Sequence, residues 1–202
     1  DYKSMENVLR DEGTIAEDII RSSGRYGLDI IPANMNLDAA AVDLMLDKEA
    51  NQMTRLKEVL QQVEDRYDYC FIDCPPGVGI NVLNALVAAN DVIIPIKADK
   101  NALDGMEELT EVIEEVRPYN PGLSMVKCLV TMFTNDIEVV KGEEALQKST
   151  YSTFYTHIRH SKKVNAWTFE KGKSLVEVTP KSAATRDYKN LALEYMDLTK
   201  GA

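Results

Sequence analysis

A carboxylate stands at the end of an apolar run, directly before two prolines and a glycine. Asp73 closes the run Tyr69–Cys74, and Pro75, Pro76 and Gly77 follow. The carboxylate could cap the turn and the next helix by accepting backbone N–H bonds. It could equally serve Mg²⁺, a hard cation that takes oxygen ligands and usually keeps several waters. The residues alone leave both interpretations open.

A doubly wound, mostly parallel α/β sheet with helices on both faces is the fold that would position this aspartate. Strands are predicted at 28–31, 69–74, 91–96, 125–133, 154–158 and 175–178, and helices at 3–21, from 38 onward, and at 53–67, 81–89, 103–116, 136–148 and 184–199. Residues 69–74 are apolar on both faces, as a parallel strand covered by two helix layers should be. Ligands of such sheets bind beyond the carboxyl ends of the strands, where Asp73 lies.

Composition indicates one ordinary globular domain over residues 1–202. The chain is 45% hydrophobic and 28% charged, and it has three cysteines, an odd number that disfavours a disulfide framework. We expect Cys70, Cys74 and Cys128 to be reduced thiols in the core. No apolar run approaches the ~20 residues that cross a bilayer, so we expect a cytoplasmic protein.

The charge is distributed unevenly along the chain. The net charge of -10 disfavours general nucleic-acid binding, yet residues 157–202 hold nine Lys and Arg against five Asp and Glu. The candidate phosphate contacts in this basic quarter are Lys162, Lys163, Lys171, Lys173 and Arg186, with Lys181 beside them. They could bind DNA without sequence preference, or they could form an ordinary solvated surface.

Three sequence blocks together carry a family resemblance. YCFIDCPPGVGINVLNALVAANDVIIPIKADKNALDG resembles the Walker B strand, the switch II loop and the following strand of ParA/MinD-type deviant Walker ATPases, and is most similar to Soj-like ParA partition proteins. GLDIIPANMNLDAAAVDL and LVTMF match further blocks in the same order. The resemblance covers roughly residues 5–135, implies a P-loop NTPase-like fold, and becomes weaker beyond them.

The resemblance implies roles in ATP hydrolysis for the segment at Asp73. Asp73 would be the catalytic and metal residue that holds Mg²⁺, through water. Pro75, Pro76 and Gly77 would form the switch II loop that reports the γ-phosphate. A strong base is not required, because phosphoryl transfer depends mainly on positioning and charge stabilisation.

The resemblance also implies contacts to the nucleotide base from the end of the predicted strand at 125–133 and from the segment near 159. These candidate cofactor-binding residues are Thr131, Met132, Asn135 and Arg159. The alternative is that they are strand ends, packed in the core or exposed to water.

Members of this family form a homodimer on ATP binding, bind DNA without sequence preference and are stimulated by a partner. The resemblance therefore implies a ParB-like partner, nucleoid association, and DNA contacts nearest to Lys162 and Lys163. Two other functions stay open: a non-catalytic interaction module of the same fold, and a MinD-like membrane-associated regulator. The acidic residues of the last predicted helix disfavour membrane binding.

The phosphate-binding loop of the family is missing from this sequence. Gly172-Lys173-Ser174 is a Gly-Lys-Ser, but it lies far past the segment at Asp73 and lacks the upstream glycine of the motif. We interpret Lys171-Gly172-Lys173-Ser174 as a basic turn. We expect the first strand and its loop to lie upstream of Asp1, so that the chain is N-terminally incomplete. The intact protein is then expected to be an ATPase, and this chain alone to bind ATP poorly and to be inactive.

Overall fold

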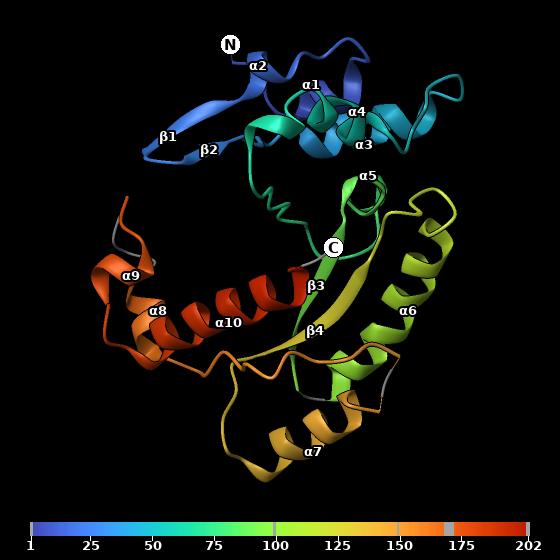
Figure 1. The fold of residues 1–202 in the computed structure, drawn as a ribbon. Helices are drawn as coiled ribbons and strands as arrows, with labels where there is room; N and C mark the ends of the chain where they lie inside the picture. The colour runs from blue at the N-terminus through green and yellow to red at the C-terminus, as the bar shows by residue number, and fades with distance from the viewer. Residues whose placement is uncertain (1, 99, 149, 168–171, 201–202) are drawn as a thin grey trace. The chain divides into compact units, whose positions relative to one another are not determined.

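The computed structural model describes residues 2–98, 100–148, 150–167 and 172–200, which divide into two compact units (Figure 1). Unit 1 contains residues 1–90 and 112–123, and unit 2 contains 91–111 and 124–202. In unit 1 the elements are α1 (Met5–Arg10), α2 (Ala16–Ile19), β1 (Arg21–Arg25), β2 (Leu28–Ile30), α3 (Leu37–Leu46), α4 (Arg55–Gln61), a 3₁₀ turn (Glu64–Arg66) and α5 (Ile80–Ala88). Those of unit 2 are β3 (Asp91–Lys97), β4 (Met125–Thr131), α7 (Ile137–Leu146), α8 (Lys162–Trp167), α9 (Leu175–Val178) and α10 (Ala183–Thr199), and α6 (Lys100–Val116) runs from unit 2 into unit 1.

Two apolar clusters among the described residues of unit 1 meet at α1. Val8 and Leu9 are adjacent in sequence and both are 1% exposed, but each belongs to a different cluster. Val8 packs with residues of α2 and α4, and Leu9 packs with residues of α3 and with Ile80 at the start of α5. A short helix thus joins four others because both of its buried side chains face apolar partners.

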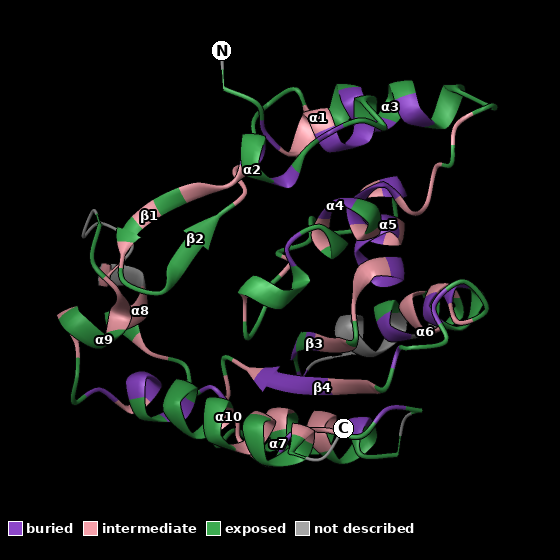
Figure 2. Ribbon diagram, turned by 45° about the horizontal axis from the view of Figure 1, so that its top comes forward, coloured by how far each residue is buried: buried purple, intermediate pink, exposed green. Residues whose placement is uncertain are grey.

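Buried amides fix α5 in unit 1, and Figure 2 shows this helix as largely buried. Asn84 is 0% exposed; its side-chain oxygen accepts from the Leu56 N–H (3.2 Å), and its nitrogen donates to two backbone carbonyls (2.8 and 3.0 Å). Asn120 donates to two carbonyls at the end of α5 (2.8 and 2.6 Å). Every polar atom of the Asn84 amide therefore has a partner, as a buried amide requires.

The prediction of a strand at Tyr69–Cys74 is wrong for this structure. Residues 69–74 form neither a helix nor a strand, and Phe71 is 85% exposed. A strand exists only where a neighbour takes its backbone hydrogen bonds, and none of the strands in the described residues pairs with this segment. Ile72 still packs against the Val8 cluster. The apolar composition of residues 69–74 is therefore not sufficient to predict a strand.

The predicted strand at 28–31 is confirmed as β2, but its partner was not predicted. β1 pairs with β2 antiparallel, although the sequence predicts a helix that extends to residue 21. The predicted helix over 3–21 is divided into α1 and α2, with Gly13 in the turn between them. Glycine in the middle of a helix costs about 1 kcal/mol relative to alanine, which favours this interruption.

The sheet of unit 2 is parallel, as predicted. β3 and β4 pair in register from Asp91↔Met125 to Lys97↔Thr131, so both carboxyl ends lie at one edge. Cys128 and Val130 of β4 are 0% exposed. Helix α7 packs so closely that a Cβ added at Gly142 would lie 2.4 Å from the Ala98 carbonyl oxygen, directly after β3.

The predicted strand at 154–158 is an irregular parallel neighbour of β4 rather than an assigned strand. The Phe154 N–H donates to the Cys128 carbonyl and the Ile158 N–H to the Val130 carbonyl, both at 2.9 Å. The segment from Phe154 to Ile158 therefore advances four residues where β4 advances only two, from Cys128 to Val130. The extra residues, Tyr155 and Thr156, donate their N–H groups to Glu194 of α10 instead, at 2.7 and 2.8 Å.

Two further predictions are corrected. The predicted strand at 175–178 is helix α9, whose Ser174 and Glu177 bond each other's backbone N–H groups in a capping box (3.3 and 2.6 Å). This Ser-x-x-Glu pattern starts helices even when apolar residues surround it. Of the expected core thiols, Cys128 is buried, but Cys70 and Cys74 are exposed; all three are free.

Candidate functional site

The segment Asp73–Gly79 is an exposed loop that leads directly into the buried helix α5. Gly77 has φ +94°, a conformation that side-chain-bearing residues rarely adopt, and a Cβ there would have nothing within 4 Å. Glycine is therefore needed for its backbone conformation and not for space. Ile80, 6% exposed, anchors the far end of the loop in the core.

Asp73 does not act as a helix cap in the structure. The N-cap of α5 is Gly79, and no side chain caps the helix. Glycine has no side chain that could accept from the first backbone N–H groups of α5, and helix starts attract anions. Near them, the side-chain oxygen of Asn81 is buried without a hydrogen-bond partner. Burial, and secondarily the charge of Asp73, raises the pKa of the Cys74 thiol.

In unit 2, Thr131, Met132 and Asn135 lie at and just beyond the carboxyl end of β4. The Thr131 hydroxyl donates to the Ile96 carbonyl (3.3 Å), which ties it to β3. Met132 has φ +51° and is 57% exposed. A bulky residue in this region is a backbone outlier of the kind that clusters at functional sites. Asn135 is exposed on the loop before α7.

Arg159 lies beside the same strand end, because residues 133 and 159 form an isolated parallel bridge. Its guanidinium is held by Asp187 of α10, with Nη2 2.6 Å from Oδ1 and Nε 3.0 Å from Oδ2. The Arg159 backbone N–H also donates to Asp187 (3.0 Å). Burial tends to raise the pKa of Asp187, but the hydrogen bonds and charge of Arg159 outweigh burial and lower it.

Two carboxylates of α10 organise this region, and neither was predicted from the sequence. Asp187 and Glu194 are two helical turns apart, so they lie on one face of α10. Together they accept the backbone N–H groups of Tyr155, Thr156 and Arg159. The spacing of the two acids was the available signal, but acidic residues on a helix usually mark a solvated face.

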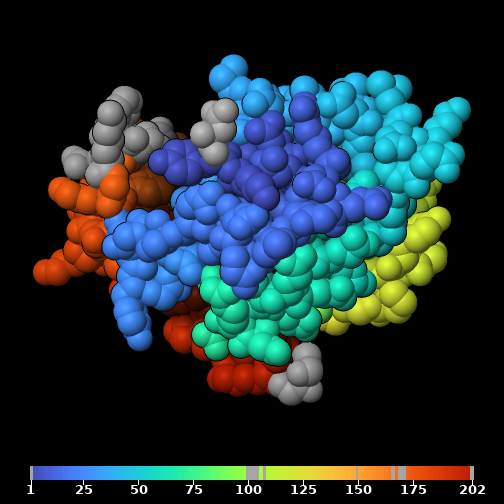
Figure 3. Space-filling view, turned by 90° about the horizontal axis from the view of Figure 1, so that it is seen from above, coloured from blue at the N-terminus to red at the C-terminus, as the bar shows by residue number. Residues whose placement is uncertain are grey.

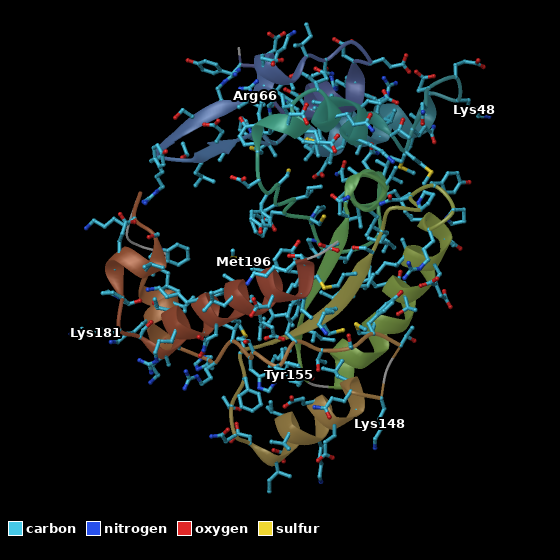
Figure 4. All side chains as sticks on the ribbon, in the orientation of Figure 1. Lys48, Arg66, Lys148, Tyr155, Lys181 and Met196 are labelled. Atoms are coloured by element: carbon cyan, nitrogen blue, oxygen red, sulfur yellow. The ribbon has the colours of Figure 1, made fainter. Side chains whose placement is uncertain are left out.

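The basic candidates lie on several elements of unit 2. Lys162 and Lys163 are exposed at the start of α8, and Arg186 donates to the Lys181 carbonyl at 2.9 Å near the start of α10, where Figure 4 labels Lys181. The Lys173 carbonyl accepts from the Trp167 indole N–H (2.6 Å), and Lys171 is outside the described residues. A common DNA-binding face for these cations stays a prediction.

The described part of the chain lacks two further features, a metal cluster and a membrane-spanning helix. No group of three or more His, Cys, Asp and Glu side chains gathers there at distances suited to a metal ion. Within the same residues, no helix is long and apolar enough to cross a membrane.

Residues 1–125 match the family described as AAA domain. Chromosome partitioning protein ParA of Myxococcus xanthus is 42% identical over 110 residues, which are 54% of this chain and 38% of that protein. Sporulation initiation inhibitor protein Soj of Bacillus subtilis is 31% identical over 193 residues, which are 93% of this chain and 74% of that protein. The chain thus spans well under two thirds of the first of these relatives.

Solved structures have the same fold. A plasmid partition protein from Borrelia burgdorferi aligns with a TM-score of 0.71 at 20% identity, over 98% of this chain and 72% of that one. Cobyrinic acid a,c-diamide synthase from Mycobacterium smegmatis, with bound ATP analog and magnesium, aligns with a TM-score of 0.71 at 24% identity, over 79% of this chain and 63% of that one. At these identities the likeness concerns the fold alone, an α/β sheet of the P-loop type.

Proposed function

We propose that this chain, which belongs to the ParA/MinD-type ATPases, serves the partitioning of a chromosome or plasmid as one ATPase domain. The observation that supports this most is the similarity to Soj over 93% of the chain. The exposed loop Asp73–Gly79 ahead of the buried helix α5 agrees with it. An intact protein with this function would hydrolyse ATP to ADP and phosphate.

In this proposal, ATP and Mg²⁺ bind at the loop Asp73–Gly79. Asp73 would hold Mg²⁺ through water, because its exposed carboxylate suits a hard cation that keeps part of its hydration shell. The uncapped N–H groups at the start of α5 suit an anionic ligand nearby. Mg²⁺, when bound, neutralises charge on the phosphate oxygens. The switch II loop would change conformation according to whether the γ-phosphate is present; its residues are Pro75, Pro76 and Gly77.

The proposed nucleotide contacts at the end of β4 differ in their surroundings: three are at least partly exposed to solvent, and one is bonded to a carboxylate. Met132 and Asn135 are exposed, and Thr131 is half-buried. Arg159 gives two of its guanidinium nitrogens to Asp187. We therefore assign Arg159 the role of an oriented donor that is fixed by α10, rather than that of a free cation.

The proposed cycle follows from the family. ATP binding would produce a homodimer, the dimer would bind DNA without sequence preference, and a ParB-like partner would stimulate hydrolysis. DNA binding would bring the protein to the nucleoid. Lys162 and Lys163 are the preferred DNA contacts because they are adjacent and exposed.

Asp73→Ala in the intact protein tests the catalytic part. We expect phosphate release in the presence of Mg²⁺ and DNA to fall at least ~100-fold, because loss of the metal residue removes charge stabilisation from the transferring phosphate. Asp68→Ala, an exposed aspartate shortly before, is the matched control. Circular dichroism checks the fold. Unchanged turnover in Asp73→Ala would remove this residue from the site.

Charge reversal tests the DNA contacts separately. We expect Lys162→Glu with Lys163→Glu to weaken retention on nonspecific duplex DNA, and to reduce the slope of log affinity against log salt by about 1.8, which corresponds to two lost phosphate contacts. Lys141→Glu with Lys148→Glu changes the net charge equally on α7 and just after it. Equal retention in both double variants would mean that Lys162 and Lys163 are an ordinary solvated surface.

A further inference from the structure

Helix α3 of unit 1 is apolar on two opposite sides. Its inner side packs in the core: Ala40 and Leu44 are 0% and 3% exposed. Its outer side presents Val42, Met45 and Leu46, which are 54%, 59% and 75% exposed. A helix that is apolar all round normally lies inside a protein. This one is on the surface of the molecule, as the space-filling view shows (Figure 3).

The three exposed side chains, here called the α3 outer face, are neighbours. Positions three and four apart on a helix lie on one side, so Met45 and Leu46 both adjoin Val42. One more methionine, Met35, is 98% exposed just before the helix begins. Scattered apolar residues are normal on a surface, but a group on one helix face marks an interaction site.

Acidic side chains surround the α3 outer face. Asp38 is one turn before Val42, and Asp47 and Glu49 follow the end of the helix. Residues 37–50 hold four acids and one lysine, Lys48, which lies on the loop beyond α3 (Figure 4). One of the four acids, Asp43, is paired with Arg10 (3.1 Å). The apolar face is thus framed by net negative charge.

We propose that the α3 outer face binds a short amphipathic helix of a partner protein, which carries lysines and arginines beside its apolar residues. The apolar side would cover Val42, Met45 and Leu46, and the cations would meet the acidic frame. Methionine suits such a surface because its flexible thioether adapts to different partners. This inference rests on α3 alone and does not depend on the proposed partition function.

The same charges disfavour the other occupants. An anionic lipid surface would be repelled by the acidic frame, since membrane-binding helices carry cations beside their apolar face. A second copy of this chain that docked α3 against α3 would bring the two acidic frames together, and like charges across an interface are unfavourable. A cationic helix satisfies both the apolar and the charged part of the surface.

The test uses the intact protein and an 18-residue fluorescent peptide of leucine and lysine with helical spacing, measured by anisotropy. We expect binding that weakens with salt, and at least a ~10-fold loss of affinity in Leu46→Lys. Leu193→Lys on α10 is the control, because this leucine is 62% exposed and the charge change is the same. The control should change affinity less than ~2-fold.

Four outcomes would overturn the proposal. The first is equal binding of a peptide in which glutamates replace the lysines, and the second is equal loss in Leu46→Lys and Leu193→Lys. The third is co-sedimentation with phosphatidylglycerol vesicles that Leu46→Lys abolishes, which would indicate a membrane surface. The fourth is self-association in analytical ultracentrifugation that only Leu46→Lys disperses, which would indicate a second copy. Thermal unfolding checks that both variants are folded.

Discussion

The two candidate segments, one in each unit, are held in opposite ways. In unit 1, residues 69–79 form no helix or strand and are largely exposed. In unit 2, the segment beside β4 is bonded to the strand on one side and to Asp187 and Glu194 on the other. The segment in unit 2 is therefore fixed by hydrogen bonds on both sides, whereas the segment in unit 1 has no strand beside it among the described residues.

The largest expected effect concerns the cysteines, which report on this difference directly. Cys70 and Cys74 are exposed, and partial burial of their thiols raises the pKa of both, whereas Cys128 of β4 is fully buried and its pKa is raised to about 11. The thiolate is the reactive form, so we expect iodoacetamide at about pH 8 to modify Cys128 at least ~100-fold more slowly than the other two. Peptide mass spectrometry measures the rates.

The control for this experiment is the unfolded chain in urea, in which all three cysteines should react at similar rates. Protection of Cys70 comparable to that of Cys128 in the folded chain would break the comparison, because it would mean that residues 69–74 are packed in a sheet.

The next effect is the loss of the carboxylate that holds the segment beside β4. Asp187→Asn should lower the free energy of unfolding by about 2 kcal/mol, because Asp187 is 7% exposed and its bonds to Arg159 are charge-assisted. Asp197→Asn, on the same helix but in an exposed pair with Lys200, should cost less than ~0.5 kcal/mol. Urea unfolding followed by fluorescence of the single tryptophan, Trp167, measures both.

The pH dependence of the same contact has a defined sign. The folded-state pKa of Asp187 is lowered, so its contribution is complete above the unfolded value of about 3.9 and is lost as pH falls through the folded pKa. The difference between wild type and Asp187→Asn should therefore be constant near neutral pH and shrink below about pH 4. A difference that grows in acid would contradict this assignment.

The smallest expected effect tests the packing of α7. Gly142→Ala places a Cβ 2.4 Å from the Ala98 carbonyl oxygen, so the helix must shift, at a cost of about 1–2 kcal/mol. Gly105→Ala on α6 has nothing within 4 Å and should instead stabilise the chain by up to ~1 kcal/mol. Denaturation midpoints compare the two. Equal effects would mean that α7 does not approach β3 closely.

The sequence predicted elements whose evidence is local. β3, β4, α5 and α10 follow from apolar runs and helical spacing, and all are present. The strand at 69–74 was wrong because pairing depends on a neighbour, which composition does not reveal. The strand at 175–178 was wrong because the Ser-x-x-Glu cap was overlooked, although it was visible in the sequence.

The candidate site was predictable in its motif but not in its supports. The run ending in Asp73, Pro75 and Pro76 identified the loop before α5, and the match to ParA-type proteins agrees with the interpretation. The bond of Arg159 to Asp187 joins residues 28 positions apart in sequence. No local pattern links them, because only the packing of α10 along the strand brings them together.

The buried amide of Asn84 has a consequence for the uniqueness of the native state. A leucine would occupy similar space, but apolar contacts between two helices keep nearly the same energy when one helix shifts slightly along the other. Several alignments of the two helices would then have similar stability. The amide makes all of its bonds in one alignment only, and any slide leaves a buried polar atom without a partner. The helix that follows Gly79 is therefore fixed in one position, even though the loop before it is exposed.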